Sequence, residues 1–248
     1  MNNDLFKKKY LKYKNKYLIL KKSLKGGSKS FIENRSSILL DLKRSSRWSY
    51  DHSERVSWLC NLVSEKYNQN KDFIKLTTEA GLFHDLGKEC INKDILNSTI
   101  NTRKDDVPDD IKNAIIDELK KHPEYTKKIL DKYTFPKQYS CKNEKCLKKF
   151  PIICGDHHEK LNGNGYPEGK KDICIITQIV TVCDIYDSLR SARPYKSSRN
   201  HEETISILKA MNKNKGLNDN IIEILDKINV PELWIYNNKY KLSLIENT

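Results

Sequence analysis

From about residue 30 onward, hydrophobic residues recur every three or four positions, which is the spacing of one face of a helix. This spacing predicts helices at 53–67, 72–86, 108–121, 124–133, 150–159, 173–190, 202–211 and 219–228. Strand-like alternation is scarce before the last residues, where 234–236 and 242–245 fit either a strand pair or a packed tail. The pattern therefore predicts an all-α fold, a helical bundle with a short irregular or β-like C-terminal tail.

One segment within the helical region lacks the helical spacing. Residues 134–149 contain Pro136, Cys141, Cys146 and five lysines, and we interpret them as a surface loop between two helices. The spacing of Cys141 and Cys146 leaves a metal or disulfide role open beside a chance occurrence. The other five cysteines lie in apolar or helical stretches, where reduced intracellular cysteines act as small hydrophobic residues. They are Cys60, Cys90, Cys154, Cys174 and Cys183.

The positive charge of the chain is concentrated at its beginning. The whole sequence has a formal net charge of +13, and ten lysines and one aspartate give residues 1–30 a charge of +9. Residues 3–25 read as a basic helix that ends at Gly26 and Gly27. Two interpretations remain open for this tail: it binds an anionic surface or nucleic acid, or it is a solvated appendage.

Length and composition predict one domain, or one domain with appendages. We divide the 248 residues into a basic tail at 1–29, a globular domain at 30–230 that includes the 134–149 loop, and a C-terminal tail at 231–248. No apolar run reaches eighteen residues, so no transmembrane segment is predicted, and the lysine-rich start lacks the apolar core of a secretory signal. We therefore expect an intracellular, cytoplasmic protein.

Two adjacent pairs of polar residues follow apolar helical stretches: His84 with Asp85, and His157 with His158. Neutral imidazole and carboxylate are the side chains that hold iron, manganese or zinc. Adjacent residues on a helix point about 100° apart, so both members of a pair can reach metals beside the helix end. A carboxylate between two imidazole clusters can bridge two ions, as in sites that hydrolyse phosphate esters. A single histidine is more often structural, so the spacing alone leaves both interpretations open.

These residues also carry a resemblance to a known family. The segment 84–88, His-Asp-Leu-Gly-Lys, resembles the HDxGK signature of the HD superfamily of metal-dependent phosphohydrolases. The segment 157–167 resembles the HHE…GxGYP signature of its HD-GYP subgroup, and 182–189 with 193–196 resembles the D-x-x-D-A/S-L…RPYK segment. His52 and His122 match two further family positions, so the resemblance covers about residues 47–228 and leaves out only His201 among the histidines.

The resemblance implies an all-helical phosphodiesterase that hydrolyses cyclic di-GMP or a similar cyclic dinucleotide. It implies two divalent metal ions, iron or manganese, with Asp85 bridging them and a metal-activated water attacking the phosphorus. Lys88 would act electrostatically at the phosphate, Arg193 and Lys196 would hold the phosphates of the ligand, and Tyr166 would line the nucleotide pocket. The implied metal ligands are His52, His84, Asp85, His122, His157, His158 and Asp184.

The chain departs from the family pattern at three places. Trp48 stands where members with three metals have a glutamate, which predicts two ions here. Asn162 replaces the usual aspartate of the GYP loop, which puts the loop conformation or the preference for guanine in doubt. Residues 134–149 look like an insertion between His122 and His157.

The basic start of the chain resembles leader segments of giant-virus proteins, which would place the protein in a eukaryotic host cytoplasm or a virion. Cyclic di-GMP is not an expected messenger in such a host, so the substrate could be another cyclic dinucleotide. Two other functions stay open: a phosphohydrolase acting on mononucleotides or other phosphate esters, and a non-catalytic nucleotide-binding or scaffold module.

Overall fold

The computed structural model describes residues 29–68, 70–96, 108–140, 149–191, 198–228 and 230. Several predictions fall outside these residues: the basic helix at 3–25, the pair Cys141 and Cys146, the phosphate contacts Arg193 and Lys196, and the tail at 231–248. The division of the chain into one domain and two tails therefore stays a prediction.

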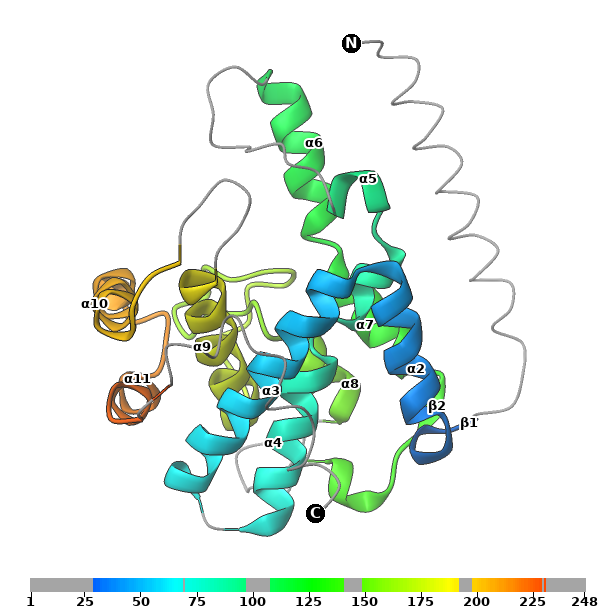
Figure 1. Cartoon of the computed structure of the whole chain (residues 1–248), viewed down its shortest axis with the longest axis horizontal. Helices are drawn as coiled ribbons and strands as arrows, with labels where there is room; N and C mark the ends of the chain where they lie inside the picture. Colours follow the sequence, from blue (N-terminus) through cyan, green and yellow to red (C-terminus); the bar gives the residue numbers. More distant parts are fainter. Residues whose placement is uncertain are drawn as a thin grey trace.

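Helices account for almost all of the regular secondary structure in the described residues, which confirms the predicted all-α class (Figure 1). The only strands in the described part are β1 (Lys29–Ser30) and β2 (Tyr133–Thr134), which form a short parallel pair. The α-helices are α2 (Phe31–Ser45), α3 (Arg47–Tyr67), α4 (Lys71–Phe83), α5 (Lys93–Leu96), α6 (Asp109–Leu119), α7 (His122–Leu130), α8 (Phe150–Gly155), α9 (Ile175–Arg190), α10 (His201–Met211) and α11 (Asp219–Asp226). Short 3-10 helices occupy Leu86–Cys90 (η1), Lys137–Tyr139 (η2) and Asn212–Asn214 (η3).

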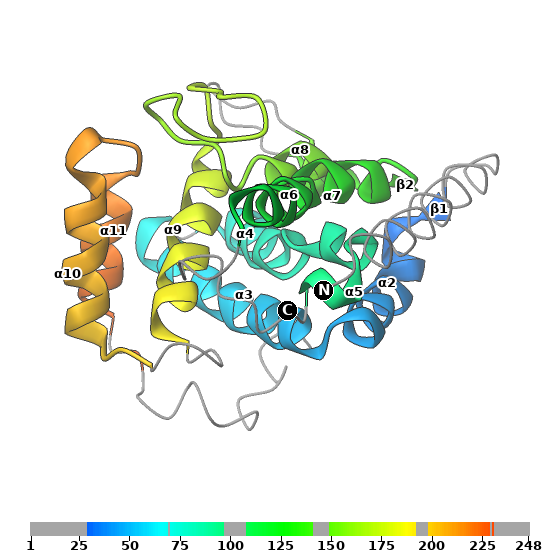
Figure 2. The ribbon, with the colours of Figure 1, turned by 90° about the horizontal axis from the view of Figure 1, so that it is seen from above.

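The centre of the bundle is formed by α3, α4 and α9, which pack against one another. Helices α2, α7 and α8 lie on one side of this trio, and the α10–α11 pair lies on the other side, against α9 (Figures 1 and 2). His201 begins α10 and links these layers: Tyr186 of α9 donates its hydroxyl to Nδ1, while Nε2 donates to the carbonyl of Asp226 in α11. His201 thus has a structural role, as expected of the histidine that matches no motif.

A single serine separates the first two helices. The backbone N–H of Ser46 donates to the carbonyl of Leu42 and so ends α2, while its hydroxyl accepts from the N–H of Ser49 and caps α3. A serine that caps the free N–H groups of a helix start stabilises it by roughly 1 kcal/mol. The sharp corner at Ser46 lets α3 begin directly before Trp48 and His52.

Five aromatic rings pack together where α2, α4 and α8 meet the start of the predicted loop. This aromatic cluster consists of Phe31, Phe83, Phe135, Tyr139 and Phe150. The ring centroid of Phe31 lies 5.1 Å from Phe83, 4.6 Å from Phe135 and 5.5 Å from Phe150. The rings of Phe135 and Tyr139 are therefore part of the apolar core, so the prediction of a surface loop over the whole of 134–149 is wrong at these two residues.

The structure corrects three local predictions. Helix α7 begins at His122 with Pro123 in its first turn, instead of beginning after the proline, because proline needs no hydrogen-bond partner there. The helix predicted at 72–86 ends at Phe83, and the chain then continues as η1. Cys174 is disulfide-bonded, so it is not a reduced hydrophobic residue; it stands before the start of α9 and not within it. Cys60, Cys90, Cys154 and Cys183 are not disulfide-bonded, as expected.

Candidate metal centre

The structure brings all seven predicted ligands together although they come from five separate parts of the chain. His52 lies in α3, His84 and Asp85 follow α4, and Asp184 lies in α9. His122 begins α7, while the 157–158 pair follows α8. Their ligand atoms form overlapping groups whose members lie within 4.8 Å of one another. These groups are His52, His84 and Asp85; His84, His157 and Asp184; and His122, His157 and His158.

Asp85 lies between the histidines. Its Oδ2 atom is 3.5 Å from Nε2 of His52 and 3.4 Å from Nε2 of His84. Its Oδ1 atom is 3.2 Å from Nε2 of His122 and 3.8 Å from Nε2 of His157. Each carboxylate oxygen therefore faces a different pair of imidazoles, which is the arrangement that a carboxylate bridging two cations requires.

Backbone carbonyls hold three of the histidine rings. In His84, His122 and His157, Nδ1 lies 2.8, 2.6 and 2.7 Å from the carbonyl oxygen of the residue three positions earlier. This contact fixes a proton on Nδ1 and leaves the lone pair of Nε2 directed at the centre. Within the part of the chain that the structure describes, the buried Nε2 atom of His84 has no hydrogen-bond partner. An unpaired buried nitrogen among carboxylates and imidazoles fits a divalent cation, which would satisfy it.

His52 is held differently, by a carboxylate. Its Nδ1 atom lies 2.7 Å from Oδ2 of Asp187, and its Nε2 atom lies 3.0 Å from Oδ1 of Asp184. Arg55 donates to both oxygens of Asp187, at 2.7 and 2.9 Å, and also to the hydroxyl of Ser191. Sequence reasoning did not assign a role to Asp187 or Arg55. The sequence spacing could have indicated both residues. Asp187 lies one helical turn after Asp184, and Arg55 lies one turn after His52, so each shares a helix face with a predicted ligand.

Burial decides the protonation state of three histidines of the centre: His122, His157 and His158. It lowers the pKa of His122 to about 4 and holds the pKa values of His157 and His158 well below the ordinary value. For His52, burial also acts to lower the pKa, but hydrogen bonds to Asp184 and Asp187 outweigh it and raise the pKa. Three of these imidazoles are therefore neutral near pH 7, which is the form that binds metals.

The carboxylates are ionised in spite of their burial. Burial favours the protonated acid, but Lys88 and His84 beside Asp85 hold its pKa well below the ordinary value. Burial also favours the protonated form of Asp184, but its hydrogen bond with His52 holds its pKa well below the ordinary value. Lys88, the residue expected at the phosphate, forms an ion pair with Asp85 and so lies at the centre. The site thus combines ionised carboxylates with neutral imidazoles.

The glycine of the His-Asp-Leu-Gly-Lys segment is explained by a close approach of two elements. A Cβ atom on Gly87 would lie 2.0 Å from the carbonyl oxygen of His122. The N–H of Gly87 donates to the hydroxyl of Thr126 at 2.8 Å, and that hydroxyl donates to the carbonyl of His84 at 3.0 Å. A side chain at position 87 would therefore push α7, and His122 with it, away from the centre.

The loop after the second histidine pair forms one edge of the centre. The ring of Tyr166 stacks on His158 with the centroids 4.5 Å apart and the planes inclined by 24°. The loop is held by Glu159, whose carboxylate accepts from the N–H groups of Glu168 and Lys170 at 2.8 and 2.9 Å. Sequence reasoning placed Tyr166 at the site, and the structure adds Glu159 as the residue that holds its loop.

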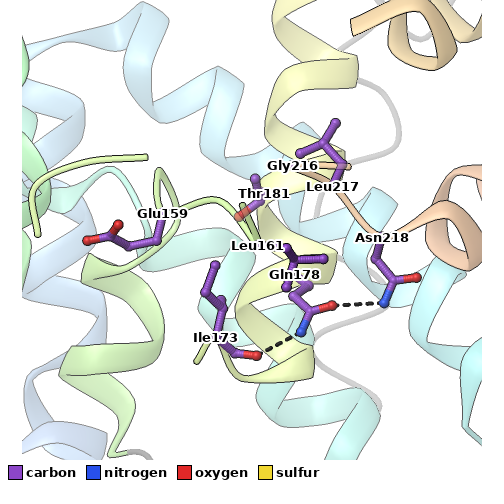
Figure 3. Close-up of a pocket in the computed structure, with 8 residues that line it drawn as sticks. All are labelled: Glu159, Leu161, Ile173, Gln178, Thr181, Gly216, Leu217 and Asn218. Carbon is purple, nitrogen blue, oxygen red and sulfur yellow. Dashed lines mark hydrogen bonds between the residues drawn. The ribbon is translucent and has the colours of Figure 1, made fainter. Parts of the chain in front are cut away.

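A small cavity lies between α9 and the 216–218 segment (Figure 3). Its wall includes Gln178, which donates to the carbonyl of Ile173 and accepts from Asn218. Thr181, also in the wall, donates its hydroxyl to the carbonyl of His157 at 2.7 Å. None of the seven predicted ligands lines this cavity, so we interpret it as part of the packing that supports the 157–158 pair.

Comparison with known proteins finds that residues 38–219 match the HD domain family. A cyclic di-GMP phosphodiesterase of Pseudomonas aeruginosa is 28% identical over 169 residues, which are 67% of this chain and 36% of that protein. A 3′3′-cGAMP-specific phosphodiesterase of Vibrio cholerae is 31% identical over 166 residues, which are 66% of this chain and 32% of that protein. The chain thus spans about a third of the length of these curated relatives.

Two solved structures share the fold. An HDG"Y"P protein of Bdellovibrio bacteriovorus aligns with a TM-score of 0.51 and 22% identity, over 71% of this chain and 50% of that chain. The HD domain of the L. monocytogenes phosphodiesterase PgpH, in complex with cyclic-di-AMP, aligns with a TM-score of 0.52 and 15% identity. The alignment covers 77% of this chain and 92% of that chain. In the described part of this chain, no helix is both long and apolar enough to cross a bilayer.

Proposed function

The chain belongs to the HD domain family, and from this premise we propose that it is a metal-dependent phosphodiesterase that hydrolyses a cyclic dinucleotide similar to cyclic di-GMP. The observation that carries the proposal is the position of Asp85 between two groups of buried histidines. The curated relatives support the substrate class, because those named above act on cyclic di-GMP or 3′3′-cGAMP.

The proposed ligands divide into two groups around one shared carboxylate. On one side are His52, His84 and Asp184, on the other are His122, His157 and His158, and Asp85 belongs to both. Two divalent ions, iron or manganese, would lower the pKa of a bound water toward neutrality and neutralise charge on the phosphoryl oxygens. We propose two ions because Trp48 offers no ligand atom where a carboxylate would be needed for a third.

Other side chains would bind and orient the phosphate. Lys88 contacts Asp85, so its ammonium is suited to stabilise the charge that develops on the scissile phosphate or the leaving oxygen. We propose that Arg193 and Lys196 hold the phosphates of the ligand, on the strength of their motif. Tyr166, stacked on His158, would border the nucleotide.

The proposal is tested with the purified full-length chain loaded with Mn²⁺ or Fe²⁺. We expect about two ions per chain by elemental analysis, and conversion of at least one of cyclic di-GMP, 3′3′-cGAMP and cyclic di-AMP to a linear dinucleotide or mononucleotides, detected by mass spectrometry. Mononucleotides and simple phosphate esters complete the panel. A chain that binds two ions yet hydrolyses no cyclic dinucleotide contradicts the proposal, and hydrolysis of mononucleotides alone favours the other enzymatic function.

A further inference from the structure

Aromatic side chains stack on the two ends of a line of histidine rings. The line runs through the metal centre from His52 to His84, His157 and His158, and neighbouring centroids are 5.3, 4.8 and 4.1 Å apart. Trp48 stacks on the His52 end and Tyr166 on the His158 end. Tyr166 belongs to the recognised motif, whereas nothing in the proposed catalysis uses the ring of Trp48.

The indole of Trp48 has a fixed orientation beside the centre. Trp48 lies one helical turn before His52 on α3, and the two rings are parallel within 5° with centroids 5.5 Å apart. Whereas His52 is only 1% exposed, Trp48 is 37% exposed. A large apolar ring is thus held at the border between solvent and a buried polar centre. Burial under a flat apolar ligand would be favourable for such a ring, by about 25 cal/mol for each Å² removed from water.

A positive charge links the indole to the centre. The Nζ atom of Lys88 lies 5.8 Å from the centroid of the Trp48 ring, and the same ammonium pairs with Asp85. At the other end of the line, Nζ of Lys120 lies 5.9 Å from the centroid of Tyr166. Each end therefore offers an aromatic ring beside an ammonium group, which is the combination that proteins use for a base and its neighbouring phosphate.

From this arrangement we propose that Trp48 is a stacking surface for one nucleobase of the substrate, and so a residue that determines specificity. The inference rests on the proposed function. A cyclic dinucleotide carries two bases on either side of its phosphates, so a phosphate held at the metal centre can place one base toward Trp48 and the other toward Tyr166. A ligand without a base, such as inorganic phosphate, gains nothing from the indole.

The test compares Trp48→Ala and Trp48→Phe with the wild type, each as the full chain loaded with Mn²⁺. Calorimetry measures binding of the bis-phosphorothioate analogue of cyclic di-GMP, the corresponding analogues of 3′3′-cGAMP and cyclic di-AMP, and inorganic phosphate. We expect Trp48→Ala to weaken binding of the best cyclic dinucleotide on the order of tenfold, the effect of removing one base–aromatic stack. Trp48→Phe keeps a ring and is expected to stay within about threefold of the wild type, because phenylalanine also stacks.

Tryptophan fluorescence provides a second measurement and a matched control. Trp58 lies further along α3 and packs against the core. We expect the cyclic dinucleotide to quench fluorescence in the wild type and in Trp58→Phe, and the quenching to disappear in Trp48→Phe. Metal content and phosphate affinity are expected to be the same in all variants, which would show that the centre is intact.

Three outcomes would overturn the inference. Wild-type affinity of Trp48→Ala for the cyclic dinucleotide shows that no base stacks on the indole. An equal loss of phosphate affinity in Trp48→Ala shows that Trp48 acts by supporting His52. A wild-type chain that binds phosphate but no cyclic dinucleotide removes the proposed function and the inference together, and it is recognised before any variant is made.

Discussion

The metal centre and the aromatic cluster are both buried, and the same helices build them. Phe83 is the last residue of α4 and packs in the aromatic cluster, while the next residue, His84, belongs to the centre. Helix α8 repeats this division, since Phe150 at its start packs in the cluster and His157 follows its end. Two neighbouring parts of one bundle thus bury opposite kinds of side chain.

The difference between them lies in what burial does to the free energy of folding. Burying the rings of Phe31 and Phe150 removes apolar surface from water and stabilises the protein directly. Burying imidazoles and carboxylates is unfavourable unless each polar atom finds a partner. The Nε2 atom of His84 has no hydrogen-bond partner among the described residues. The cluster therefore stabilises the fold, while the centre is arranged for a cation that would complete it.

The sharpest way to separate the two regions is to remove the shared carboxylate. We expect Asp85→Ala to lower the proposed phosphodiesterase activity by at least about 10³-fold, equivalent to about 4 kcal/mol in the barrier. The stability of the metal-free protein is expected to change much less, because the contacts with Lys88 and His84 that the variant loses are partly offset by the desolvation cost of the carboxylate, which it also removes. Turnover and urea unfolding in EDTA measure the two effects. Strong loss of metal-free stability would show that the centre also stabilises the fold.

Truncation in the aromatic cluster should have the opposite result. Phe150 is fully buried and contacts three other rings of the cluster within 5.5 Å. Phe150→Ala is expected to lower the free energy of unfolding by about 3–5 kcal/mol, equally with and without metal, and Phe150→Leu by much less. Urea titrations in both states measure this. A loss that metal abolishes would show that the regions are coupled.

The carboxylate behind His52 offers a finer test of the centre. Asp187→Asn keeps the shape of the side chain but removes the charge held by Arg55, and we expect it to weaken metal binding by about 10- to 100-fold. Competition with a metal chelator measures the affinity, and elemental analysis shows whether one ion of two is lost. Arg55→Lys, which keeps the charge, is expected to have a smaller effect. Unchanged affinity in Asp187→Asn would mean that Asp184 alone holds His52.

The smallest effect concerns Glu89, a half-buried carboxyl in η1 outside the centre. Burial, assisted by Asp41, raises its pKa from 4.5 to about 7. The folded state therefore binds this proton more tightly than the unfolded state, and stability falls as the pH rises from about 4.5 through about 7. Glu89→Gln should stabilise the protein by about 1 kcal/mol at pH 8, a value reduced for partial exposure, and hardly at pH 4. Melting temperatures at both pH values measure this; an equal shift at both would exclude titration as the cause.

Sequence reasoning identified most of the helices, though not α2 or α5, and the residue types of the centre, but it misplaced the ends that matter most for the site. It predicted a helix through His84 and Asp85, whereas α4 ends at Phe83. The period of apolar residues continues through Leu86, so the pattern carries no sign of the break. After the break, Gly87 packs closely against His122, a contact between residues far apart in the chain that the local pattern does not record.

What the sequence by itself determined is local: the helical period, the adjacent pairs at 84–85 and 157–158, and the kind of ligand each position offers. Only the tertiary structure decided which atoms face one another, as when Asp187 reaches His52 across 135 positions or Trp48 lies flat on the imidazole beside it. The physical reason is that a helix is specified by interactions within about four residues. The convergence of side chains depends instead on how whole helices pack, which no short stretch of sequence records.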